Sequence, residues 1–246
     1  MNIKILETSL NLRFERGKKN KDYILSKAIA MKQLEVPDVD IYCNVEYMRC
    51  TDDEYLHSFK KAGYNAFTAV DEKGRGILCE IKNEYEVTTI EKMNEPHMLH
   101  LHISKDNTHI NLITVRLLVA GGDEKDFKNR KGQWDKIVNY IESLKDKSNL
   151  IVTGDFNHGV INNDGNYFSK PREFYNYQMV LSDLYKRNVK IYPISGNSYR
   201  GYMKIDHIAT GKKIEVINAK YKDMFDNINC IGIPDHSCIV AELNCA

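Results

Sequence analysis

Hydrophobic residues alternate with polar residues, or form short uninterrupted runs, in many stretches of the chain. Alternation with a period of two is typical of a strand that buries one face, and a short apolar run is typical of a strand buried on both faces. These stretches are rich in β-branched and aromatic residues, which fit a pleated surface. The pattern predicts strands over 3–12, 39–46, 65–70, 76–82, 86–91, 98–104, 109–119, 149–156, 203–211, 214–222 and 236–243.

Apolar residues at helical spacing predict helices over 20–34, 126–144 and 171–185. The first of these helices carries its apolar stripe on Ile24, Ala28, Met31 and Leu34. Such stripes are typical of core contacts rather than of a cofactor site. Because strands outnumber helices and the helices fall between groups of strands, we expect an α/β protein with two packed sheets and helices outside them. No linker or repeat divides the 246 residues, so we expect one domain over 1–246.

The charge balance narrows the function only slightly. With 35 Lys and Arg against 34 Asp and Glu, the net charge is +1, which excludes a generic polycation. It does not exclude a nucleic-acid enzyme, because a cleft can be basic on a neutral protein and a bound metal adds positive charge. The N-terminus lacks the apolar core of a signal peptide, and no segment approaches the roughly 18 apolar residues of a membrane span. We therefore expect a cytoplasmic protein without membrane contact, and we infer no protein partner.

The cysteines suggest no zinc site, because none of the 6 forms a Cys-x-x-Cys pair. Cys43, Cys79 and Cys238 lie inside apolar runs, where a free thiol behaves as a small hydrophobic group. We expect them to be reduced and buried.

Polar residues occur where several predicted strands begin or end, which is where functional residues tend to gather. They are Asn11, Glu46, the Gly154-Asp155-Phe156-Asn157 segment, Asp206, and the Asp235-His236 pair. Each has an ordinary structural explanation, such as a turn, a helix start or a charge at a sheet edge. Together they form a set of oxygen ligands that suits Mg²⁺ or Mn²⁺ rather than Zn²⁺. A carboxylate beside a His also suits general acid–base chemistry.

The order of these segments resembles that of the endonuclease/exonuclease/phosphatase superfamily, which includes DNase I-like nucleases, abasic-site endonucleases, sphingomyelinases and inositol-phosphate phosphatases. The resemblance extends from Asn11 to Leu243 and depends on the combination of Gly-Asp-Phe-Asn with the late Asp-His pair. It implies a four-layer α/β sandwich, in which two mixed sheets pack face to face between outer helices. It also implies a Mg²⁺-dependent phosphodiester hydrolase.

The resemblance further implies a role for each residue. Glu46 resembles the principal metal ligand, assisted by Asn11 and Asp235. Asp155 resembles the carboxylate that orients or deprotonates the attacking water, and Asn157 the amide that holds the phosphate or the nucleophile. His236 resembles the His that contacts the scissile phosphate, and Asp206 the acid that orients this His.

Arg116 departs from the family pattern, which often has His or Tyr at this strand position. An Arg keeps its proton and cannot act as a general acid, but it can bind a phosphate oxygen. An ion pair on the sheet face is an equally good explanation. Tyr199 and Arg200 precede Asp206 and could stack on or clamp a substrate, or could pack at the rim.

The favoured function is a nuclease acting on DNA or RNA through in-line attack of water on a phosphate ester. The alternatives are a phosphatase or a lipid or inositol-phosphate phosphodiesterase of the same fold, and a non-catalytic binding protein that retains the fold. The sequence does not choose among these substrates, nor between endo- and exonuclease action.

Overall fold

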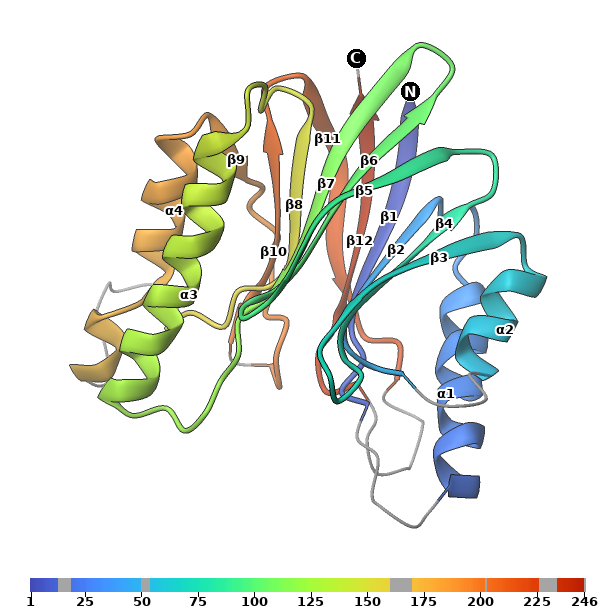
Figure 1. Cartoon of the computed structure of the whole chain (residues 1–246), viewed down its shortest axis with the longest axis horizontal. Coiled ribbons are helices and arrows are strands. Elements are labelled where there is room, and N and C mark those ends of the chain that lie inside the picture. Colours follow the sequence, from blue (N-terminus) through green and yellow to red (C-terminus); the bar gives the residue numbers. More distant parts are fainter. Residues whose placement is uncertain (13–18, 50–53, 160–169, 202, 226–233, 246) are drawn as a thin grey trace.

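The computed structural model describes residues 1–12, 19–49, 54–159, 170–201, 203–225 and 234–245, and they build two β-sheets packed face to face (Figure 1). The first sheet has the strand order β11-β12-β1-β2-β4-β3, with bounds Ile214–Lys222, Cys238–Cys245, Asn2–Ser9, Ile41–Met48, Arg75–Lys82 and Tyr64–Val70. The second has the order β5-β6-β7-β8-β10-β9, with bounds Glu86–Asn94, His97–Lys105, Thr108–Arg116, Leu150–Asp155, Asp206–Gly211 and Val189–Ile191. Both sheets are mixed, because β1 pairs with β2 and β7 with β8 in parallel while their other pairs are antiparallel.

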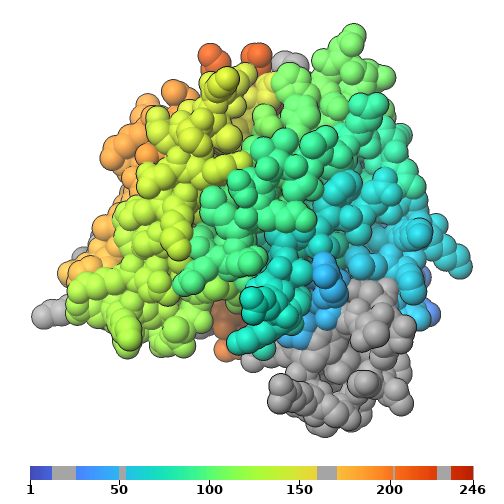
Figure 2. Space-filling view, viewed as in Figure 1, coloured from blue at the N-terminus to red at the C-terminus, as the bar shows by residue number. Residues whose placement is uncertain are grey.

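Helices cover the outer face of each sheet (Figure 1). On the first sheet these are α1 (Lys19–Leu34) and α2 (Glu54–Lys61), and on the second α3 (Glu124–Ser143) and α4 (Tyr177–Tyr185). A short 3-10 helix, Lys170–Glu173, precedes α4. In the space-filling view, α3 lies beside the surface formed by the edge hairpin of β5 and β6 (Figure 2). The predicted α/β sandwich is therefore confirmed.

The buried apolar residues form three clusters, one for each interface of the four layers. The central cluster lies between the sheets and includes Ile5, Leu101 and Ile208. A second lies between the second sheet and its helices and includes Trp134, and a third lies between the first sheet and its helices and includes Phe59. Burial of this apolar surface is the main driving force for stacking the layers.

Helix α1 buries only part of its predicted apolar stripe, because Leu34 packs against the core whereas Met31 does not. Met31 is 53% exposed, whereas the polar Gln33 is fully buried. Gln33 Nε2 donates to Thr8 Oγ1 at 2.9 Å and to Asn44 Oδ1 at 2.8 Å, and its oxygen accepts from the Tyr55 hydroxyl. The prediction for Met31 was wrong because a buried hydrogen-bond network, rather than apolar spacing, sets the rotation of this helix.

The segment predicted as one helix over 171–185 is divided. The chain turns after the 3-10 helix, and α4 begins after Asn176, whose side chain accepts a hydrogen bond from the Met179 backbone N–H. Sequence patterns also missed α2 and β9, which are short.

Cys43, Cys79 and Cys238 are free and buried, as predicted, and so is Cys245. Cys50 and Cys230 lie outside the described residues. Among the helices of the described ranges, none is both long and apolar enough to cross a membrane.

Candidate active site

One row of side chains crosses the second sheet near the end of its strands. In order across β6, β7, β8 and β10, the row consists of His97, Arg116, Asp155 and Asp206. Residues paired across adjacent strands point to the same face of a sheet. Ile151 lies four residues before Asp155 on β8 and belongs to the core between the sheets. An even separation along a strand keeps the same face, so the whole row faces the first sheet.

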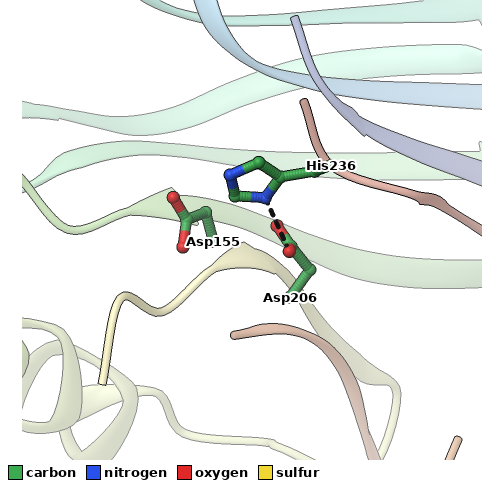
Figure 3. A group of neighbouring side chains, drawn as sticks. All are labelled: Asp155, Asp206 and His236. Atoms are coloured by element: carbon green, nitrogen blue, oxygen red, sulfur yellow. Dashed lines mark hydrogen bonds and ion pairs between the residues drawn. The ribbon is translucent and has the colours of Figure 1, made fainter. Parts of the chain in front are cut away.

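His236 approaches this row from the first sheet, just before β12, and its ring points toward two of the carboxylates (Figure 3). Its Nδ1 lies 2.8 Å from Asp206 Oδ2. Potential ligand atoms of Asp155, Asp206 and His236 all lie within 4.8 Å of one another. The side chain of His236 is 7% exposed and that of Asp206 is fully buried. The sheets therefore bring together three residues that are far apart in the sequence.

The carboxylates hold His236 in its protonated form. Burial alone would lower the pKa of His236, but the negative charges of Asp206, Asp155 and Asp235 outweigh burial and raise it to about 10. Burial and the charge of Asp206 raise the pKa of Asp155 to about 7, although His236 and Arg116 act in the opposite direction. The cluster thus consists of an imidazolium beside a carboxyl group that titrates near neutral pH.

Asp155 is held by the segment that follows it. The Asn157 backbone N–H donates to Asp155 Oδ1 at 3.0 Å, and Asn157 Nδ2 donates to Asp155 Oδ2 at 2.6 Å. Asn157 Nδ2 also donates to the Leu117 carbonyl at 2.8 Å, and Arg130 Nη1 donates to the Asn157 carbonyl at 2.9 Å. These contacts fix the positions of both the Asp155 carboxyl group and the Asn157 amide.

Glycine is required just before Asp155. Gly154 has a φ of 128°, and a Cβ there would lie 2.1 Å from the Val115 carbonyl oxygen of the adjacent strand. The Gly-Asp-Phe-Asn segment therefore combines a close approach of β8 to β7 with a turn that starts at the catalytic candidate.

Asn11 and Glu46 lie side by side at the same end of the first sheet. The Leu12 N–H donates to the Glu46 carbonyl at 3.2 Å, which extends the pairing of β1 with β2, and both Asn11 and Glu46 line one cavity. Glu46 forms an ion pair with Arg116, so the structure shows the ion pair that the sequence had offered as one explanation of this Arg.

Positive φ angles occur at four of the predicted site residues: Asn11 at 48°, Glu46 at 55°, Asn157 at 44° and Arg200 at 47°. Left-handed backbone is uncommon for residues other than glycine, and Asn adopts it more readily than Glu does. Such strain tends to persist at functional sites, where the surrounding structure holds it in place.

Asp235, Tyr199 and Arg200 surround His236 on its other side. Arg200 Nη2 lies 3.3 Å from Asp235 Oδ2, and Asp235 Oδ1 lies 3.9 Å from His236 Nε2. The Tyr199 ring packs on the His236 ring with a centroid distance of 4.8 Å. Asp235 therefore lies beside His236, whereas Asn11 lies beside Glu46.

Glu7 is a buried acid that sequence patterns missed. It is fully buried on β1, and neither of its carboxyl oxygens has a hydrogen-bond partner among the residues the structure describes. Burial first, and then the charge of Asp206, raise the pKa of Glu7 well above its usual value. The sequence feature that indicates this buried acid is its even spacing from Ile3 and Ile5, which places Glu7 on the same inward face of the strand.

Oxygen donors at the site suit a hard divalent cation. Glu46 and Asn11 offer a carboxylate and an amide at one cavity, and Asp235 offers a second carboxylate beside His236. Asp155, Asp206 and His236 are close enough together to hold a cation. His236, whose pKa is raised to about 10, already supplies a positive charge in that cluster.

The molecule is thus an α/β sandwich with an acidic and histidine-containing site at one end of its sheets. No family model matches the chain, and no curated protein matches its sequence. Solved structures do match its fold. D. rerio TDP2 in complex with a single-strand DNA product has a TM-score of 0.65 and 13% identity, covering 99% of each chain.

Two other structures give the same result. Truncated TDP2 from Caenorhabditis elegans has a TM-score of 0.62 and 14% identity, covering 99% of this chain and 97% of that one. An endonuclease/exonuclease/phosphatase family protein from Leptotrichia buccalis has a TM-score of 0.58 and 14% identity, covering 98% and 99%. The chain therefore has the fold of endonuclease/exonuclease/phosphatase proteins, as its sequence resemblance implied.

Proposed function

We propose that the chain is a divalent-metal-dependent phosphodiester hydrolase that cleaves nucleic acid by in-line attack of water. The observation that carries this proposal is the His236–Asp206 pair, 2.8 Å apart, set beside Asp155. The single-strand DNA product bound by D. rerio TDP2, which has a similar fold, supports nucleic acid as the substrate. We also propose that residues 1–246 form one domain and that the protein acts in the cytoplasm. Both proposals rest on the sequence.

The residues present fit Mg²⁺ or Mn²⁺, with Glu46, Asn11 and Asp235 as the residues that would hold it. Their oxygens are the donors that these ions prefer. The buried Asp206 Oδ1 receives no hydrogen bond from any described residue, so the acidic side of the site is not fully compensated. The ion, when bound, supplies positive charge to the phosphate oxygens. Arg116 pairs with Glu46, and it would be available to a phosphate oxygen if Glu46 held the cation.

His236 and Asp206 stabilise charge on the phosphate. Because Nδ1 of His236 donates to Asp206, the ring is held in one orientation and its Nε2–H is left for a phosphate oxygen. The imidazolium neutralises negative charge that develops as water attacks. Arg116 binds phosphate but cannot supply a proton to the leaving group.

Asp155 takes the proton of the attacking water. A carboxyl group whose pKa is about 7 suits a general base at neutral pH. Asn157 has its Nδ2 engaged with Asp155 and the Leu117 carbonyl, so the amide oxygen is the group left to hold the nucleophilic water. Tyr199 and Arg200, at the side of His236, bind the substrate by ring stacking and by charge.

The test compares variants on a substrate panel with Mg²⁺ and with EDTA. The panel contains bis(p-nitrophenyl) phosphate, single- and double-stranded DNA, abasic DNA, RNA and phosphoinositides. Asp155→Ala and His236→Ala are each expected to lower kcat/KM by about 10²–10⁴-fold, which is the usual contribution of such groups. Asp135→Ala and His57→Ala remove the same residue types at positions on α3 and α2, outside the site, and are expected to keep wild-type activity.

Three results would contradict the proposal. Full activity in both site variants would show that the active site is elsewhere. Unchanged cleavage in EDTA would show that the reaction does not depend on a divalent metal. Hydrolysis of phosphoinositides without cleavage of any polynucleotide would show that the substrate is a phosphoinositide and not nucleic acid. Calorimetric titration with Mg²⁺ separates the non-catalytic alternative, because a binding protein that merely retains the fold is expected to bind no ion.

A further inference from the structure

A cavity of about 300 Å³ opens beside the candidate metal ligands, at one end of the polar row. Its charged walls are Glu46, Arg75 and Arg116. Glu46 is already paired with Arg116, so Arg75 is the remaining charged group of the lining, and the Asp71 carboxylate that accepts from its backbone N–H lies outside the lining. The cavity therefore favours an anion even before a cation binds to Glu46.

His97 also lines this cavity, and its ring offers a polar atom that lacks a partner. The residue is 4% exposed, and no described residue hydrogen-bonds to its Nδ1. Arg116 Nε is likewise buried without a hydrogen-bond partner in the described chain. Burial, followed by the positive charge of Arg116, lowers the pKa of His97 to about 4, so the ring is neutral at physiological pH. Unsatisfied buried polar groups are costly, and a ligand oxygen would satisfy them.

We propose that this cavity is a subsite for a second phosphate of the substrate, next to the one that is cleaved, with Arg75 and His97 as its contacts and Arg116 between the two phosphates. This inference rests on the proposed phosphodiesterase function and specifies its substrate class. A polynucleotide carries successive phosphates along one chain, whereas a lipid phosphodiester such as sphingomyelin carries a single one.

The position of the cavity along the sheet agrees with this assignment. Arg116 lies one strand away from Asp155 and His97 lies two strands away in the same row. Adjacent strands are spaced about 4.8 Å apart, so Arg116 lies about 5 Å and His97 about 10 Å from Asp155 along the row. Arg75 begins β4 on the facing sheet and closes the cavity from the other side. A chain cleaved at Asp155 would therefore place its neighbouring phosphate here.

Three dinucleotides test the subsite, because each contains one cleavable diester bond. They are thymidylyl-thymidine, the same compound with a 5′-phosphate, and the same compound with a 3′-phosphate. With wild-type protein, kcat/KM for one of the phosphorylated forms is expected to exceed that for the unphosphorylated form by about tenfold, as one charge-assisted contact provides. In Arg75→Gln this ratio is expected to fall to within about twofold of one, and Arg75→Lys is expected to recover part of it.

Lys73→Gln is the matched control, because Lys73 is an exposed cation in the same β3–β4 hairpin and does not line the cavity. It is expected to keep the wild-type ratio. Arg75 is itself exposed and its backbone N–H donates to Asp71 Oδ1, so the Gln variant retains the turn.

Binding measurements keep the subsite testable on its own. Dissociation constants for the three dinucleotides, measured with Ca²⁺ in place of Mg²⁺, are expected to show the same preference and the same loss in Arg75→Gln. Equal affinity of wild-type protein for all three, or an unchanged ratio in Arg75→Gln, would overturn the subsite. Failure to cleave any dinucleotide while the binding preference persists would instead refute the proposed function. An Arg75-dependent preference for inositol 1,4-bisphosphate over inositol 1-phosphate, without one among dinucleotides, would reject a polynucleotide.

Discussion

Glu7 is the least expected side chain in the molecule. It lies on β1 inside the core between the sheets, and its pKa is raised first by burial and then by Asp206. A carboxyl group in this position holds its proton in the folded protein at a pH where the unfolded chain has released it. The nearby candidate active site already contains Asp155 and Asp206, so a charged Glu7 would add a third negative charge to it.

Replacement of Glu7 by Gln is expected to make the stability of the protein less sensitive to a rise in pH. Because the folded-state pKa lies above the ordinary value of 4.5, the contribution of Glu7 is fully present below that value and is lost as pH rises toward the folded-state pKa. The free energy of unfolding of the wild type, relative to Glu7→Gln, should therefore fall above about pH 4.5, by at most about 1.4 kcal/mol per pH unit. Urea denaturation of both proteins from pH 5 to 8 measures the difference.

An exposed acid provides the control for this comparison. Glu72→Gln changes the same residue type in the β3–β4 turn, and its stability relative to wild type is expected to stay nearly constant over this pH range. A constant difference for Glu7→Gln as well would show that Glu7 is ionised in the folded protein.

At the scale of elements, the end of β8 is the part of the site with the strictest backbone requirement. Gly154→Ala would place a Cβ against the Val115 carbonyl and force a left-handed residue, because a methyl group there would lie 2.1 Å from that oxygen. Strain and overpacking together are expected to lower the free energy of unfolding by about 2–5 kcal/mol and to displace Asp155. Urea denaturation and activity assays measure the two effects.

A second glycine gives the opposite expectation. Gly132 lies in the middle of α3 and is exposed, and a Cβ added to it would meet no atom within 4 Å. Gly132→Ala is expected to stabilise the protein by about 1 kcal/mol through helix propensity alone, with unchanged activity. Equal effects of the two substitutions would contradict the explanation given for Gly154.

Long strands and helices could be predicted from the sequence because each carries many repeats of one pattern. The helix predicted over 126–144 is observed as α3, and Trp134 and Ile137 of its stripe are buried. Helix α2 was missed because only Tyr55 and Phe59 of its residues are buried, which is too few to define a period. β9 has 3 residues and offers even less.

The candidate site divides in the same way. Residues at strand ends, such as Asp155 and Asp206, could be named from local patterns, and the register of β8 with β10 places them opposite each other. Contacts between the sheets could not be predicted, because no local pattern encodes them. The pairing of Glu46 with Arg116, and the position of His97 beside that pair, follow only from the packing of one sheet on the other.

At the scale of the whole molecule, each sheet provides part of the site and neither contains it. The second sheet contributes the row from His97 to Asp206, and the first contributes Glu46 and the segment with His236. The central core fixes the distance between them, and the net charge of +1 leaves no strong overall field to attract a polyanion. If the chain acts on nucleic acid as proposed, the affinity must therefore come from local contacts and from the cation.

This distribution of charge predicts a weak dependence of DNA binding on salt. If Arg75 and Arg116 contact two phosphates of a single strand, log K should fall with log salt with a slope of about −1.4, since each phosphate contributes about 0.7. Affinity is then expected to drop about sevenfold between about 50 and about 200 mM salt. Fluorescence anisotropy with a labelled single-stranded oligonucleotide, in Ca²⁺, measures this slope. Arg75→Gln should make it shallower by about 0.7, because one phosphate contact is lost.

Lys220 allows the local and the global explanations to be separated. It lines a different groove, together with Lys4 and Lys222 on the first sheet, and it is exposed. Since this groove takes no part in the proposed substrate path, Lys220→Gln is expected to leave the slope unchanged. A slope steeper than about −4, reduced by Lys220→Gln as much as by Arg75→Gln, would mean that nucleic acid extends over the outer surface of the sheet. In that case the near-zero net charge would conceal an extended binding surface, and the cleft would be only one part of it.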